Sequence, residues 1–239
     1  MDDFEQIQAY DTDENKTLYM SYFRVLQGIL VSLEAVDEVK GIKKPQGSKS
    51  SSYIKAAKEL QSYFINAGAI KEVIDALPQV PSFKLSHGQQ CRYIVGKAIR
   101  NKVAHEGLWT PTFREAYTLA NNRRPIYAFA YEAEEVTEGI SKLYATRKYG
   151  DTDKEQRKAQ RDKQKLLDSK NFVQSKADNG YLDIIAFTSE HADSLFPAYV
   201  EHIEQAYMNC KMQSLSSMRK SFDLTTIDDQ LSLLQTRFK

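Results

Sequence analysis

Apolar side chains recur at helical spacing along most of this chain. Between residues 18 and 33 they stand at every third or fourth position, and Asp13 precedes them as the expected N-cap. Similar runs follow, separated by short stretches rich in Gly, Pro, Ser, Asn and Asp. The expected helices cover residues 14–39, 53–66, 69–77, 89–105, 109–119, 126–149, 154–176, 189–212 and 215–239. Residues 181–187 fit a strand or a helical turn equally well, because the run is too short for periodicity to decide.

These elements predict an all-α fold, a helical bundle with an additional C-terminal helical region. Gly (10) and Pro (6) are scarce among the 239 residues, which favours long helices over many short strands. Gly68 is expected to end one helix and Gly107 to cap another. The Gly150–Asp151 pair is the expected boundary between residues 1–149, the main bundle, and residues 150–239, a helical extension that also fits packing into the same domain.

Composition narrows the function classes. The two cysteines, Cys91 and Cys210, form no CxxC pair and no His lies at ligand spacing, which favours a reducing compartment and argues against a zinc site. No signal peptide is expected, and the most apolar stretch, residues 20–36, carries Arg24 and Glu34 and is too polar to span a membrane. Motifs for phosphate-binding loops, dinucleotides, zinc proteases and serine hydrolases are absent. We therefore expect a cytoplasmic protein without a metal or cofactor.

The net charge of +1 is unevenly distributed. Residues 1–41 hold nine acidic and three basic side chains, whereas residues 142–170 hold ten basic and five acidic ones. The basic block is suited to binding a polyanion, but its interleaved acids are also typical of a solvated helix face. A third interpretation is a structural helical protein in which the acidic and basic segments pair between subunits and association weakens in salt.

The helix expected at residues 89–105 has two distinct halves. Its apolar half holds Ile94, Val95, Ala98, Ile99 and Val103, and its polar half holds Lys97, Arg100, Asn101, Ala104 and His105. On a straight helix Arg100 and His105 point about 140° apart, with Asn101 and Ala104 between them. Asn101 and His105 are an i,i+4 pair. The polar half therefore places an Arg and a His on either side of a small shelf.

These residue types suit metal-independent cleavage of RNA. The ribose 2′-hydroxyl is the nucleophile, so the reaction needs a group that removes its proton and a cation that stabilises charge on the phosphate. A His works near neutral pH, an Arg presents donors that fit phosphate oxygens, and Asn101 is placed to orient the His105 ring or the substrate. One chain supplies one such His, so the chemistry favours a homodimer with a composite site.

The run Arg100-Asn101-Lys102-Val103-Ala104-His105 resembles the R-x4-6-H motif of the HEPN superfamily. The resemblance implies a helical-bundle ribonuclease related to toxins, abortive-infection proteins and the nuclease domains of type VI CRISPR effectors. It implies that Arg100 and His105 are catalytic and that Asn101 supports them. It also implies an RNA substrate, a role in antiphage defence or as a toxin, and a regulatory partner such as an antitoxin. Many members carry Gly directly after the His, whereas here Glu106 precedes Gly107.

Two alternatives accompany this hypothesis. Arg and His are common on exposed helix faces, and His is an ordinary residue near a helix C-terminus. Some HEPN-like proteins are inactive scaffolds that bind a protein or nucleic acid. The other histidines, His87, His191 and His202, are expected to serve as turn, surface and helix residues respectively, without a metal. The aromatic residues of 127–144 are expected mainly in the core, with base stacking as the alternative.

Overall fold

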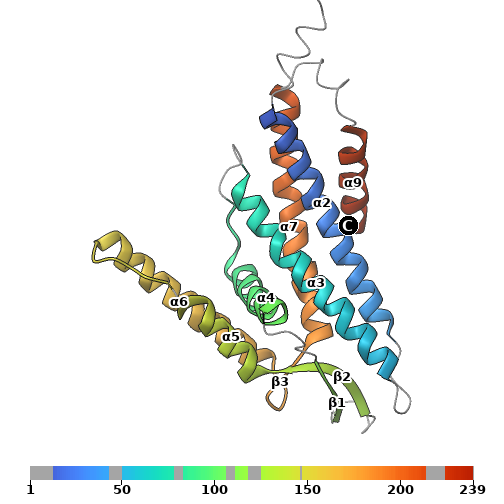
Figure 1. Ribbon diagram of the computed structural model, residues 1–239, viewed down its shortest axis with the longest axis vertical. Helices are drawn as coiled ribbons and strands as arrows, with labels where there is room; N and C mark the ends of the chain where they lie inside the picture. Colours follow the sequence, from blue (N-terminus) through green and yellow to red (C-terminus); the bar gives the residue numbers. More distant parts are fainter. Residues whose placement is uncertain are drawn as a thin grey trace, which may run out of the picture. The chain divides into compact units, whose positions relative to one another are not determined.

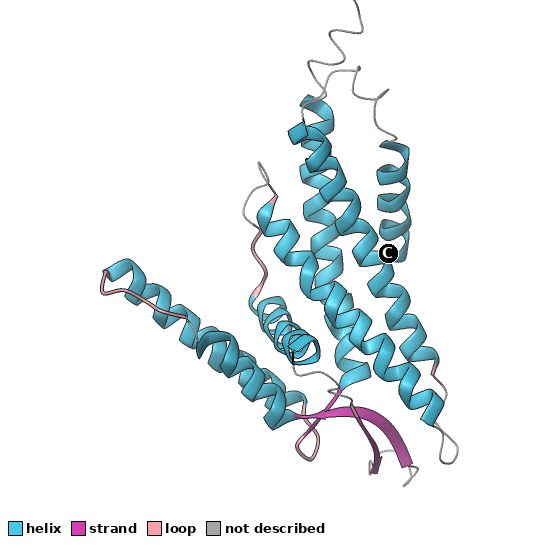
Figure 2. Ribbon diagram, viewed as in Figure 1, coloured by secondary structure: helices cyan, strands magenta, loops and turns pink. Residues whose placement is uncertain are grey.

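The computed structural model describes residues 13–42, 50–77, 83–105, 111–117, 125–145, 147–213 and 224–238. Helices dominate these ranges, and a small sheet accompanies them (Figures 1 and 2). The helices are α2 (Asp13–Gly41), α3 (Ser50–Ala76), α4 (His87–His105), α5 (Ala133–Ala145), α6 (Asp153–Lys176), α7 (Ile184–Gln213) and α9 (Leu224–Arg237). The strands are β1 (Thr112–Tyr117), β2 (Pro125–Glu132) and β3 (Tyr181–Asp183). The predicted all-α class is confirmed.

The described residues fall into two compact units. The first is drawn from Met1–Val31, Ala69–Lys84 and Asp193–Lys239, and the second from Ser32–Gly68 and Leu85–Ala192. The first unit therefore contains the start of α2, the end of α3, most of α7 and the whole of α9. The three predicted catalytic candidates on α4 (Arg100, Asn101 and His105) and the basic block (residues 142–170) belong to the second unit.

The first unit is held together by aromatic and apolar side chains. Tyr22 of α2 meets Tyr207 of α7 edge to face, with ring centroids 6.1 Å apart. Phe83 packs on Tyr199 and His202 of α7, with centroids 5.4 and 4.7 Å away. Gln235 of α9 donates a hydrogen bond of 2.6 Å to Glu204 of α7. These contacts fix α2 and α9 against α7, and each aromatic pair adds to the burial of apolar area.

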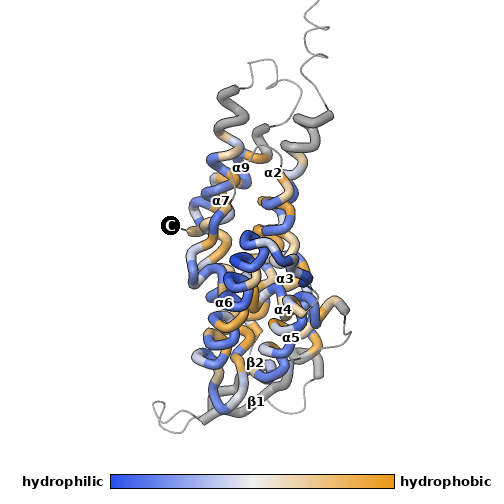
Figure 3. The backbone as a smooth tube through the Cα atoms, turned by 90° about the vertical axis from the view of Figure 1, so that its left-hand side faces the viewer, coloured by the Kyte–Doolittle hydropathy of each residue, from blue (hydrophilic) through white to orange (hydrophobic). Residues whose placement is uncertain are grey.

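The second unit places α4, α5 and α6 in mutual contact beside the sheet. Helix α6 begins at the N-cap Thr152, whose hydroxyl accepts a hydrogen bond from the Glu155 amide. Asp162, Ser169 and Val173 are its buried positions, which form one narrow stripe, while most of the helix is hydrophilic (Figure 3). The bounds Asp153–Lys176 confirm the predicted helix at residues 154–176.

The sheet corrects two predicted helices. Strands β1, β2 and β3 lie in that order, antiparallel, with Phe113 opposite Phe129 and Ala130 opposite Asp183. Residues 112–117 and 125–132 are therefore extended, and only Ala133–Ala145 of the predicted helix 126–149 is helical. Tyr127, Phe129 and Tyr131 recur at every second position, which is the period of a strand, and aromatic residues favour strands.

Helix boundaries in α3 and α7 also differ from the predicted ones. Gly68 does not end a helix, because α3 runs unbroken from Ser50 to Ala76. Residues 181–187 divide between strand β3 and the start of α7, where the Asp183 carboxylate accepts hydrogen bonds of 3.0 Å from the Ile185 and Ala186 amides. Helix α7 begins at Ile184 rather than at residue 189. The described part of the last helix, α9, begins at Leu224, and both residues 215–223 and Gly107 lie outside the described residues.

The predicted domain boundary at Gly150 falls in the link between α5 and α6, which both belong to the second unit. The division into residues 1–149 and 150–239 stays a prediction. Within the described ranges, every helix is too short or too polar to cross a membrane, as expected.

Candidate functional site

Helix α4 carries the predicted motif in its last turn and a half. A reciprocal cap fixes its start: the Ser86 amide donates to the Gln89 side chain at 3.0 Å, and the Gln89 amide donates to the Ser86 hydroxyl at 3.4 Å. Ile94, Val95, Ala98, Ile99 and Val103 are all buried, so the predicted apolar half is confirmed. The cap and this buried half together fix which residues α4 presents on its other side.

Arg100 rests against α3. Gly68 faces it, and a Cβ added at Gly68 would lie only 3.0 Å from the Arg100 Cγ and 3.1 Å from its Cδ. The alkyl stem of Arg100 therefore runs across a position where α3 has no side chain. This close approach gives Gly68 a structural reason to be Gly within an unbroken helix. It also holds the half-buried Arg100 side chain at its base.

Asn101 points to a different neighbour. It is half-buried and lines a cavity of about 470 Å³ between α4, the C-terminal end of α5 and α6. Gln90, Tyr93, Ile94 and Lys97 line the same cavity, so one stripe of α4 forms one of its walls. Ala104 is exposed, as the predicted shelf requires. Arg100 and Asn101 thus lie on adjoining sides of α4 rather than in one pocket.

His105 is the last residue of α4, and its side chain lies outside the described residues. The roles of Arg100, Asn101 and His105 as a catalytic set stay a prediction.

Positive charge gathers at the cavity beside Asn101. Its lining includes the basic residues Lys97, Lys142, Arg147 and Lys165 and one acidic residue, Asp162. Lys97 comes from α4, whereas the other three belong to the basic block recognised in the sequence. The sequence pattern did not reveal that Lys97 joins them, because the contact between α4 and α6 depends on tertiary packing.

Asp162 organises one wall of this cavity. Arg147 donates to its carboxylate at 2.5 Å and the Tyr149 hydroxyl donates to the same oxygen at 2.8 Å. Burial alone would raise the pKa of Asp162, but these two hydrogen bonds and the Arg147 charge outweigh it, so the pKa lies below its usual value. The Arg147 guanidinium also lies 4.4 Å from the Tyr144 ring centroid. Burial raises the pKa of Tyr144 to about 12, which keeps its phenol neutral.

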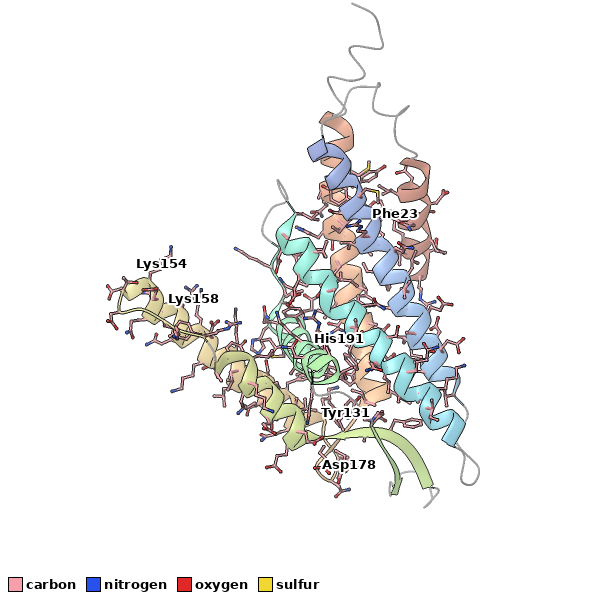
Figure 4. The ribbon with its side chains drawn as sticks, in the orientation of Figure 1. Phe23, Tyr131, Lys154, Lys158, Asp178 and His191 are labelled. Atoms are coloured by element: carbon pink, nitrogen blue, oxygen red, sulfur yellow. The ribbon has the colours of Figure 1, made fainter. Side chains whose placement is uncertain are left out.

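His191 corrects a sequence expectation. It was expected on the surface, but it is buried, and Tyr63 lies 2.6 Å from its Nδ1 (Figure 4). Burial among aromatic rings, and secondarily the Arg92 charge, lowers its pKa to about 3. Helix α7 begins at Ile184, so residue 191 lies two turns inside the helix. Phe187 and Leu195, four positions to either side, are the sequence signal that marks its buried face.

His87 and His202 lie in helices α4 and α7. His87 begins α4, is largely exposed and lies 3.8 Å from the Asp168 carboxylate. The His202 ring packs at a tilt against Phe83, and burial lowers the pKa of His202. Within the described residues, no group of three or more His, Cys, Asp or Glu side chains is arranged to hold a metal ion. Phe129 and Tyr131 are buried, which confirms their predicted core role, whereas Tyr127 lies outside the described side chains.

Comparison with protein-family models, with curated proteins and with solved structures gives no match for this chain.

Proposed function

We propose that this protein is a metal-independent endoribonuclease of the HEPN type, which cleaves RNA by attack of the ribose 2′-hydroxyl on the adjacent phosphate. The observation that carries the proposal is the placement of Arg100, Asn101 and His105 at the C-terminal end of one capped, half-buried helix. In this scheme His105 transfers protons, Arg100 stabilises charge on the phosphate oxygens, and Asn101 orients the substrate or the imidazole.

Two features of the surroundings support these roles. The alkyl stem of Arg100 lies against Gly68, which holds the base of this side chain in place. The basic cavity next to Asn101 adds positive potential near the motif, and such potential draws a polyanion toward the protein.

The scheme needs both an acid and a base, and one chain brings one motif. A two-fold dimer would bring two motifs to one cleft. The biological setting that we propose is antiphage defence or growth arrest by a toxin, with a regulatory protein or antitoxin as a partner.

The test uses purified protein, mixed single-stranded RNA and excess EDTA. Wild-type protein is expected to yield products with 2′,3′-cyclic phosphate ends, and the His105→Ala variant is expected to yield none. His87→Ala is the matched control, since His87 lies at the opposite end of the same helix and is exposed. Loss of wild-type cleavage in EDTA would exclude the mechanism. Absence of cleavage under all conditions would favour the alternative function, an inactive helical scaffold.

A further inference from the structure

The basic cavity in the second unit is built by α4, by α5 with the link that follows it, and by α6. Lys97 stands on α4, Lys142 on α5, Arg147 on the link after α5, and Lys165 on α6. A solvated helix face carries its charges along one helix, with acids at neighbouring turns. Here the cations converge on one hollow from three directions, which is the arrangement of a binding site rather than of a helix surface.

The charge of the lining selects an anion. Four basic side chains line the cavity with one carboxylate, Asp162, which already accepts hydrogen bonds from Arg147 and Tyr149. Asp162 therefore serves to position Arg147 rather than to receive a cationic ligand. Lys142 also forms an exposed ion pair of 3.3 Å with Glu138, the residue one turn before it on α5, and an anionic ligand would compete with that carboxylate. Guanidinium and ammonium groups of this kind bind phosphate oxygens through charge-assisted hydrogen bonds. A cluster of this size fits a ligand with at least two negative charges better than a single phosphodiester.

The size and the remaining lining indicate a small organic molecule. The volume of about 470 Å³ lies in the range of pockets that hold small ligands. Tyr93, Ile94, Leu143 and Tyr144 add aromatic and aliphatic surface next to the cations. The phenol of Tyr144 is neutral and so does not repel an anion. A hollow with a charged part and an apolar part suits a phosphate ester that carries an organic group.

We propose that this cavity binds a small organic phosphate with two or more negative charges, with the phosphates on Lys97, Lys142, Arg147 and Lys165. This binding does not depend on the proposed nuclease activity. The ligand would contact Asn101 and lie beside the predicted motif, where it is placed to affect access to that surface.

The test measures binding by titration calorimetry on the full chain with three probes: inorganic pyrophosphate, ATP and a short 2′-O-methyl RNA. The methylated RNA has no free 2′-hydroxyl, so the proposed cleavage cannot occur and binding is measured alone. Pyrophosphate or ATP is expected to bind. Tighter binding of ATP than of pyrophosphate would place an organic group against the apolar lining. Equal binding would overturn the part of the proposal that assigns an organic group to the apolar lining.

The variants Lys97→Gln and Lys165→Gln are each expected to weaken that binding about tenfold, because each loses one charge-assisted contact. Lys163→Gln is the matched control for Lys165→Gln, since Lys163 is an exposed residue of α6 that does not line the cavity. Lys154→Gln, at the outer end of α6, is a second control (Figure 4). Helical circular dichroism establishes that each variant is folded.

Three results would overturn the proposal: no binding of pyrophosphate or ATP, binding of the RNA alone, or equal weakening by Lys163→Gln and Lys165→Gln. The last would indicate general attraction to a basic helix. Absence of ligand binding would not affect the interpretation of the cleavage assay. Absence of RNA cleavage would likewise not affect the interpretation of this binding measurement.

Discussion

The phenol oxygen of Tyr63 lies 2.6 Å from Nδ1 of His191, within an apolar environment. The rings of Phe64 and Phe187 flank the imidazole, with centroids 6.3 and 5.7 Å away. The hydrogen bond joins α3 to the first turns of α7 in the second unit. A polar pair in such surroundings stabilises the fold only while both partners are present.

The first prediction removes one partner of this pair. Tyr63→Phe leaves Nδ1 of His191 buried without its hydrogen bond, so we expect the free energy of unfolding to fall by about 1–3 kcal/mol in urea titrations at pH 7. Tyr181→Phe is the control, because its hydroxyl contacts Glu132 at an exposed position and water replaces the lost bond. Equal effects of the two variants would contradict a structural role for the buried pair.

The second prediction concerns pH. The folded-state pKa of His191 is lowered to about 3, whereas the unfolded chain has an ordinary value near 6.5. Below about pH 6.5 the unfolded state therefore binds a proton that the folded state does not. The stability that His191 contributes is complete above that pH and is lost as the pH falls toward 3.

Between pH 7 and pH 5 the stability of the wild type should therefore fall, by up to about 1 kcal/mol per pH unit from this residue. His191→Gln should show a shallower slope, whatever its stability at pH 7. Comparison of slopes separates loss of titration from loss of packing. Identical slopes in the two proteins would show that His191 does not titrate on unfolding.

The third prediction concerns packing on the other side of the imidazole. A Cβ at Gly96 would lie 2.4 Å from Nε2 of His191, so Gly96→Ala overpacks the interior and should cost about 1–3 kcal/mol. At Gly139, also within a helix, the nearest atom to an added Cβ would be the Ala98 Cβ at 3.5 Å, an ordinary contact. Gly139→Ala should stabilise by about 0.5–1 kcal/mol through helix propensity. Thermal unfolding of both variants measures this contrast, and two equal shifts would refute it.

Local patterns predicted the helical class and the long helices well. Helix α6 was predicted from its charged pattern with a thin apolar stripe, and α4 from its two distinct halves, whereas the Ser86–Gln89 cap that starts α4 two residues earlier was not foreseen. Strand β2 was missed because its pairing partners, β1 and β3, lie outside any local window. The alternation of Tyr127, Phe129 and Tyr131 was the only local sign of it in that segment.

The candidate site was predicted only in part. The motif on α4 and the basic block were visible, but their meeting in one cavity depends on the packing of α4 against α5 and α6. The contact of Arg100 with Gly68 also joins residues far apart in the sequence. It explains why a Gly stands at position 68, inside the helical pattern of α3, although the helix does not end there.

The fourth prediction concerns Asp162. Its buried carboxylate accepts hydrogen bonds from Arg147 and Tyr149. Asp162→Asn should therefore lower the free energy of unfolding by about 1–2 kcal/mol near neutral pH. The effect is no larger because Arg147 is partly exposed and solvent screens its charge. Because the folded-state pKa lies below the usual 3.8, this contribution is present above that pH and is lost as the pH falls through the folded-state value. Chemical denaturation from pH 7 to pH 2.5 should therefore show the two proteins converging. Asp151→Asn, at an exposed position just before α6, should match the wild type throughout.

The fifth prediction rests on the proposed nuclease activity and concerns Arg100. Arg100→Lys keeps the positive charge and most of the alkyl stem that lies on Gly68, so thermal stability should not change. It removes the planar fork of donors, and if that fork stabilises charge on the phosphate, kcat should fall by about tenfold or more while KM changes little. Arg157→Lys, at an exposed position of α6, should cleave like the wild type. A rise in KM with unchanged kcat would instead assign Arg100 to substrate binding alone, because only interactions that strengthen in the transition state accelerate the chemical step.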